Sequence, residues 1–303
     1  MKNSNSANSI SASGLHFLLF ILSGLFITNS FFAQTLSDNY GSLYRFQFKN
    51  TPFPDKNRAE GHTYKDIFYD KETHYNDSTT LVFVPQYYKP ESDADIIVYF
   101  HGWNNNVDSV LSKFQLIEQL YSSKREAILV MPEGPKNAPD SYGGKLEEDE
   151  RFRLLIEEVI SGLSSKLNRK LTLGNITLAG HSGAYRVMAY ILLRGGLTSK
   201  INEVVLFDAL YGDTEKYSYW IDNYNGRFIN IYTPDGGTKK ESENLMLCLD
   251  GWNIPYTSVK GDNYSMEQLN SNRIIFIASA LGHNEVISSQ NQLMKFLSLS
   301  HRR

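Results

Sequence analysis

Cysteine is almost absent from this 303-residue sequence, in which Cys248 is the single example. One cysteine forms no intramolecular disulfide, so the fold must be stabilised by burial of a core, which a chain of this length can supply. Cys248 lies in an apolar run, residues 245–249, which predicts a small buried hydrophobe rather than a reactive thiol.

The chain also lacks an excess of charge, with a formal net charge of −3. This balance predicts no nucleic-acid partner and no attraction to an anionic membrane surface. Several ligand motifs are missing as well: His-Glu-x-x-His, paired-cysteine zinc patterns, and the glycine-rich loops for phosphates or dinucleotides. We therefore expect no metal and no cofactor, and a small molecule as the partner.

Residues 15–28 are almost wholly apolar, which is shorter than the roughly 20 residues of a spanning helix. The run is typical of a secretory signal cleaved after Ala33, so we expect an exported protein, periplasmic or secreted. Phe31, two positions before Ala33, is not the small residue that cleavage favours, so an uncleaved N-terminal anchor is the alternative. The protein would associate with a membrane only through such an anchor. The expected division is a leader, 1–33, and a single domain, 34–303.

Beyond the leader, apolar strands alternate with helix-like stretches. Strands are expected at 42–48, 78–85, 96–100, 127–131, 176–179, 204–207, 228–232 and 274–277. Helices are expected at 109–121, 148–167, 184–193, 239–249 and 284–299. The continuous apolar runs indicate parallel strands buried on both faces. The pattern predicts an α/β fold: a doubly wound, mostly parallel sheet with antiparallel strands at its N-terminal edge.

Two long segments, 132–145 and 211–227, have no clear periodicity. Both leave the carboxyl ends of central strands, where open α/β sheets bind ligands. They are either surface connections or the rim of a pocket.

A short apolar strand runs directly into Gly180-His181-Ser182-Gly183-Ala184, and a helix-like segment follows. A serine on such a sharp strand-to-helix turn has its hydroxyl exposed above the sheet edge. Small residues on either side let the strand and the helix pack closely enough to make the turn.

This arrangement resembles the nucleophile elbow of the α/β-hydrolases, except that Ala184 replaces the last glycine of Gly-x-Ser-x-Gly. The resemblance extends over essentially the whole chain after the leader. It implies an esterase- or lipase-like serine hydrolase that cleaves an ester through an acyl-enzyme on Ser182. An amidase or peptidase with the same triad and a non-catalytic binding protein of this fold remain open.

A serine nucleophile needs a base, and of seven histidines only His283 and His301 follow Ser182 with any separation. His301 is the third residue from the end. His283 lies between the last apolar strand and the final helix, in the loop where the resemblance implies the catalytic histidine.

Two residues compete for the acid that orients the base. Asp208 ends an apolar strand among hydrophobic neighbours, where an unpaired carboxylate would be costly. Asp235 follows the next strand, the usual place in these hydrolases, but Pro-Asp-Gly is also ordinary turn chemistry. Both stay open, with a preference for Asp208.

The oxyanion of the reaction needs two backbone N–H donors near the serine. We expect one from Gly183 and the other from Trp103, with Gly102 allowing the close approach of the backbone. His101, which precedes them, is interpreted as a structural residue of the same loop.

Overall fold

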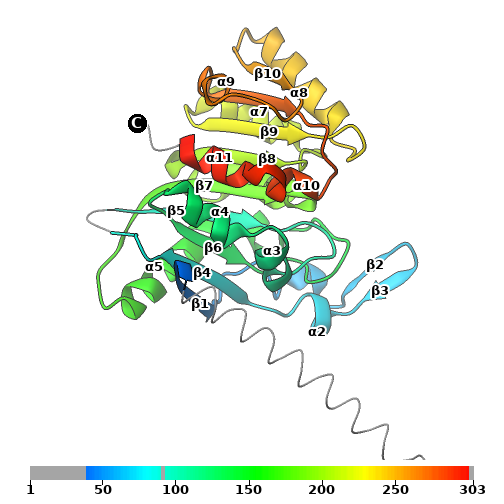
Figure 1. Cartoon of the computed structure of the whole chain (residues 1–303). Coiled ribbons are helices and arrows are strands. Elements are labelled where there is room, and N and C mark those ends of the chain that lie inside the picture. The colour runs from blue at the N-terminus through cyan, green and yellow to red at the C-terminus, as the bar shows by residue number, and fades with distance from the viewer. Residues whose placement is uncertain (1–38, 90–92, 300–303) are drawn as a thin grey trace, which may run out of the picture.

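The computed structural model describes residues 39–89 and 93–299, so the predicted leader lies outside the described residues. Within those ranges, nine strands form one sheet in the order β1-β4-β6-β5-β7-β8-β9-β11-β10. The pairs β1–β4 and β4–β6 are antiparallel and all other neighbours are parallel (Figure 1). The predicted doubly wound sheet with an antiparallel N-terminal edge is confirmed.

The sheet strands are β1 Gly41–Gln47, β4 Thr79–Pro85, β5 Asp93–Phe100, β6 Ile128–Pro132, β7 Thr172–His181, β8 Ile201–Phe207, β9 Arg227–Tyr232, β10 Thr257–Lys260 and β11 Ile274–Ala278. A separate hairpin, β2 His62–Tyr64 and β3 Ile67–Tyr69, projects from the body (Figure 1).

Helices cover both faces of this sheet. One face carries α3 Val107–Lys113, α4 Leu116–Ser123, α9 Met266–Asn270, α10 Glu285–Ser288 and α11 Gln292–Leu299. The other carries α5 Arg151–Lys166, α6 Tyr185–Arg194, α7 Thr214–Asn223 and α8 Lys239–Gly251. A short helix, α2 Lys71–His74, follows the hairpin. Figure 1 shows α3, α4 and α11 in front of the sheet.

Side-chain alternation along β5 explains why two cores form. Val98 points into the core under α5 and α6, whereas Ile97 and Tyr99 point into the core under α3, α4 and α11. All three are essentially inaccessible to solvent. A strand buried on both sides can use apolar residues at every position, which is the continuous run seen in the sequence.

The chain order across the sheet determines where a ligand can bind. β5 lies between β6 on one side and β7 on the other, so the connections after β5 and β7 run to different parts of the sheet. In open α/β sheets, the crevice for a ligand forms at the carboxyl ends of the strands at such a switch point. The Gly102 loop follows β5 and Ser182 follows β7, so both residues lie at this crevice.

The local predictions differ from the structure in several places, and the helix expected at 109–121 is divided between α3 and α4. The segment expected to be irregular at 211–227 contains α7, and the expected final helix is divided between α10 and α11. The sequence reading also omitted β10, a short strand with a single buried residue, Val259. Cys248, expected to be buried, is exposed on α8, whose buried face carries Ser242, Leu245 and Leu249 instead.

None of the helices in the described ranges has the length and apolar character needed to cross a bilayer.

Candidate active site

The strand-to-helix turn at Ser182 has the geometry of a nucleophile elbow. β7 ends at His181, a single 3-10 turn spans Ser182–Ala184, and α6 begins at Tyr185. Ser182 itself has φ of +56°, in the left-handed region that costs a non-glycine residue about 1–3 kcal/mol. This backbone strain turns the chain sharply enough to expose the serine side chain at the end of the sheet.

Ala184 fits the elbow because Gly180 supplies the missing space. A Cβ placed on Gly180 would lie 2.8 Å from the Ala184 Cβ and 2.4 Å from the Met188 sulfur. Such contacts exclude any side chain at Gly180, whereas the methyl of Ala184 is already accommodated. The departure from the Gly-x-Ser-x-Gly pattern therefore leaves the turn intact.

The loop after β5 lies directly against the elbow. A Cβ on Gly102 would be 2.6 Å from the Ser182 Cβ and 3.0 Å from the Gly183 nitrogen. Only glycine allows the backbone so close to Ser182 and Gly183. The indole of Trp103 packs over Gly183, and its Nε1–H donates to Ser141 Oγ at 2.7 Å.

A buried histidine–carboxylate pair supports this loop. His101 Nε2 lies 2.8 Å from the Glu133 carboxylate, and His101 Nδ1 lies 2.8 Å from the Gly102 carbonyl oxygen. Burial alone would lower the pKa of His101, but the hydrogen bond and the charge of Glu133 outweigh it and raise this pKa. His101 thus connects the Gly102 carbonyl with Glu133, which directly follows β6, and the backbone nitrogen of Gly134 lies 3.1 Å from the same Nε2.

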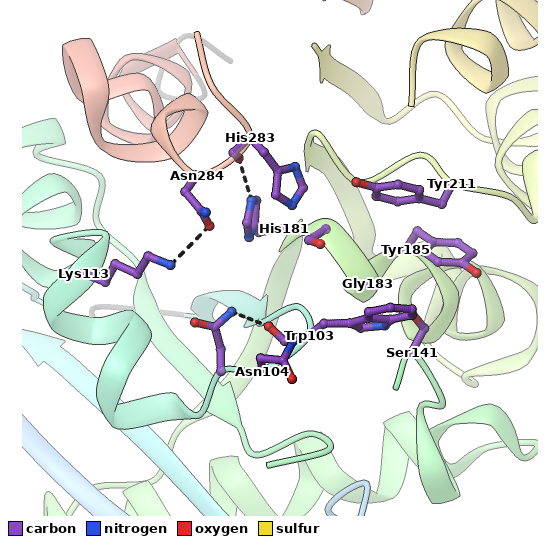
Figure 2. A pocket seen from close by; sticks show the side chains of 12 residues that line it. Trp103, Asn104, Lys113, Ser141, His181, Gly183, Tyr185, Tyr211, His283 and Asn284 are labelled. Atoms are coloured by element: carbon purple, nitrogen blue, oxygen red, sulfur yellow. Dashed lines mark hydrogen bonds between the residues drawn. The ribbon is translucent and has the colours of Figure 1, made fainter. Parts of the chain in front are cut away.

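The structure brings His283 to Asp208 and not to Asp235. His283 follows β11, and its Nδ1 lies 2.6 Å from Asp208 Oδ2. A carboxylate only accepts hydrogen bonds, so Nδ1 carries the proton and the neutral ring has its lone pair on Nε2. His283 and Ser182 line the same pocket (Figure 2).

The Asp208 carboxylate is fully buried, with 0% exposure, and is surrounded by donors. Thr233 donates from its backbone nitrogen at 3.0 Å and from its hydroxyl at 2.7 Å, and the Thr238 hydroxyl also donates. A Cβ on Gly236 would lie 1.8 Å from Asp208 Oδ2, so the turn 233–238 closes over the carboxylate. Burial alone would raise the pKa of Asp208, but the hydrogen bonds from His283, Thr238 and Thr233 hold it below its usual value.

Asp235 lies in that same turn, but its side chain is exposed to solvent. Of the two aspartates that the sequence left open with a preference for Asp208, the structure places Asp208 against His283. Pro-Asp-Gly makes the turn, while Thr233, Gly236 and Thr238 around it hold the carboxylate of Asp208.

His181, between Gly180 and Ser182, packs under His283 with ring centroids 4.6 Å apart. Its Nε2–H donates to the backbone carbonyl of His283 at 2.8 Å, while its buried Nδ1 has no hydrogen-bond partner within the described ranges. Burial, helped by the nearby His283, lowers the pKa of His181 to about 3, so the ring is neutral. His181 thus holds the backbone of His283 in place.

The pocket above Ser182 has a volume of about 540 Å³, within the usual range for small-molecule sites. Figure 2 shows Trp103, Tyr185 and Tyr211 along one wall. The Tyr211 hydroxyl donates to the Gly236 carbonyl and lies within hydrogen-bonding reach of the Ser182 side chain. Burial chiefly, with the charge of Asp208, raises the pKa of Tyr211 to about 12, so the phenol is neutral.

The two segments without clear periodicity both reach this pocket, through Ser141 and Tyr211. Among the described residues, no cluster of three or more His, Cys, Asp or Glu side chains could hold a metal ion.

Several of these residues escaped the sequence reading. Glu133 directly follows the apolar strand β6, so the reasoning that selected Asp208 as a carboxylate in need of a partner also applies to it. No sequence signal distinguishes Thr233 and Thr238, because their role depends on the register between β8 and β9.

The burial of His181 predicts a pH-dependent stability. Its folded-state pKa lies below the ordinary histidine value of about 6.5, so the unfolded chain binds more protons between the two values. Stability should therefore fall as the pH drops from about 6.5 towards 3. Replacing His181 with Phe removes this contribution, which amounts to about 2 kcal/mol between pH 7 and pH 5.

Urea unfolding of both proteins at the two pH values measures the difference. His181→Phe should be less stable at pH 7, since the His283 carbonyl loses its donor, yet lose less stability on acidification. An equal loss in the two proteins would contradict the buried neutral state of His181.

No protein-family model and no curated protein sequence matches this chain. The structure is similar to that of a ferulic acid esterase, with a TM-score of 0.51 and 13% identity over 73% of this chain and 91% of the other. It is also similar to a fluorophosphonate-binding serine hydrolase F of Staphylococcus aureus, with a TM-score of 0.52 and 10% identity over 85% of this chain and 98% of the other. At these identities the likeness concerns the fold alone, and it shows that the chain has the α/β-hydrolase fold.

Proposed function

We propose that this protein is a serine hydrolase that cleaves carboxylic esters through an acyl-enzyme on Ser182. The observation that carries the proposal is the hydrogen bond of 2.6 Å between His283 Nδ1 and the buried Asp208 carboxylate, beside the pocket that Ser182 lines. A non-catalytic role is disfavoured because the proposed base has its orienting acid.

In the proposed acylation, the Ser182 oxygen attacks the carbonyl carbon of the ester while His283 Nε2 takes the serine proton. The backbone N–H groups of Gly183 and Trp103 stabilise the oxyanion that forms. When the intermediate collapses, His283 returns the proton to the leaving alcohol oxygen, and the acyl group stays on Ser182.

Deacylation repeats these steps with water in place of serine. His283 takes a proton from water, the hydroxide adds to the acyl carbon, and the proton then returns to the Ser182 oxygen as the acid leaves. Throughout, the Asp208 carboxylate holds the ring in its Nδ1–H tautomer and stabilises the imidazolium.

We also propose that the protein acts outside the cytoplasm. The apolar run of residues 15–28 supports export, and Ala33 is the proposed cleavage site.

The first test is the reaction of Ser182 with a fluorophosphonate probe, which forms a stable adduct with an activated serine. The folded protein should be labelled at Ser182, as located by peptide mass spectrometry. Ser182→Ala and His283→Ala should not react, the first because it lacks the oxygen and the second because it lacks the base. A folded wild-type protein that resists labelling would overturn the proposal.

The two aspartates provide a matched pair for the second test. Asp208→Asn should lower kcat for ester hydrolysis by about 10³- to 10⁴-fold, because an amide no longer selects the Nδ1–H tautomer of His283. Asp235→Asn removes the same charge in the adjacent turn and should change kcat by less than about twofold, since its exposed side chain contacts neither His283 nor Ser182. Equal losses in the two variants would remove Asp208 from the proposed triad. A panel of esters and matched amides, assayed with wild-type protein, tests the preference for esters.

A further inference from the structure

The pocket that Ser182 lines has two chemically different ends. Trp103, Tyr185 and Tyr211 form an aromatic wall at one end, and Lys113 and Asn284 lie at the other (Figure 2). Lys113 is the last residue of α3, and Asn284 directly follows His283. A positive charge therefore borders the site on the side of its histidine loop.

Lys113 has no acidic partner in the part of the chain that the structure describes. Its Nζ donates to Asn284 Oδ1 at 3.2 Å and lies 5.2 Å from the ring centroid of Phe114, and no described carboxylate lies within 4.0 Å of it. The described residues that line the pocket include no Asp or Glu.

The contact with Asn284 also creates a second donor. Because Asn284 Oδ1 accepts from Lys113, the amide NH2 group of Asn284 remains free to donate. An ammonium and an amide NH2 on neighbouring side chains match the two oxygens of a carboxylate.

We propose that the substrate of this site is an anionic ester, whose carboxylate binds Lys113 and Asn284 while its scissile carbonyl lies at Ser182. The inference rests on the proposed ester hydrolase function and adds the class of substrate. The carboxylate belongs to the acyl or the alcohol half of the ester, and the two cases share the same recognition chemistry.

Two pairs of esters distinguish a carboxylate on the acyl half from one on the alcohol half. Monophenyl adipate has a carboxylate on its acyl half, and 4-acetoxybenzoate has one on its alcohol half; the methyl ester of each is the neutral match. Wild-type kcat/KM should favour the anion in at least one pair by roughly tenfold, as expected for one charge-assisted contact. The preference should shrink in high salt, because this part of the pocket is open to solvent.

Lys113→Glu should reverse the preference, and Lys113→Arg should retain it. Lys166→Glu is the matched control, since it makes the same charge change on an exposed residue at the end of α5 and leaves the pocket unaltered. Thermal unfolding of each variant checks that the fold is kept. If Lys113 only supported the histidine loop, Lys113→Glu would lower kcat/KM for the charged and neutral esters equally, which would overturn the inference.

A binding measurement separates this inference from the proposed function. Ser182→Ala protein, which lacks the nucleophile, should bind monophenyl adipate more tightly than its methyl ester by calorimetry, and a second substitution, Lys113→Glu, should abolish the difference. If wild-type protein hydrolyses the anionic and neutral esters equally well, the inference of an anionic substrate is wrong while the proposed ester hydrolase function stands. Loss of Ser182 labelling would overturn the proposed function, while equal binding of both ligands would overturn the anionic substrate.

Discussion

The buried carboxylate of Asp208 is the constraint on which the site depends. A charge with no exposure to solvent must be compensated, and here Thr233, Thr238 and His283 provide the donors. The donors come from the turn between β9 and α8 and from the loop after β11, while Asp208 itself follows β8. The need to satisfy one charge therefore holds three loops together at the carboxyl ends of adjacent strands. The same contacts leave His283 with a single orientation.

The rest of the site is assembled by close backbone packing rather than by charge. Gly180 lets the end of β7 pack closely against Ala184 and Met188. Gly102 lets the loop after β5 approach Ser182 more closely than any side chain would permit. The buried His101–Glu133 pair then holds the loop after β5 in place. Strain at Ser182 is tolerated because the surrounding packing determines the turn completely. Ser182 thus lies on a closely packed support, while the pocket above it is lined by longer side chains.

Sequence reasoning reached the fold because strands buried on both faces leave an unmistakable apolar run, as in β5. It reached Asp208 because a carboxylate at the end of such a run needs a partner. It reached His283 because only two histidines follow Ser182 with any separation and the resemblance to the α/β-hydrolases implies one in that loop. It did not find the part played by Thr233, since threonines are common and this one matters only through its place beside Asp208. Lys113 was missed for a similar reason: α3 and the loop at Asn284 are 171 residues apart in sequence, and only the fold brings them together.

The central claim is that Asp208 holds His283 in the tautomer that leaves Nε2 free to act on Ser182. NMR of the histidine rings in protein labelled with ¹⁵N measures this directly, because the protonated and unprotonated nitrogens have well-separated shifts. The account predicts a protonated Nδ1 on His283 with a strongly hydrogen-bonded proton, present in wild-type protein and lost in Asp208→Asn. A His283 ring protonated on Nε2 in the neutral wild-type protein would contradict it.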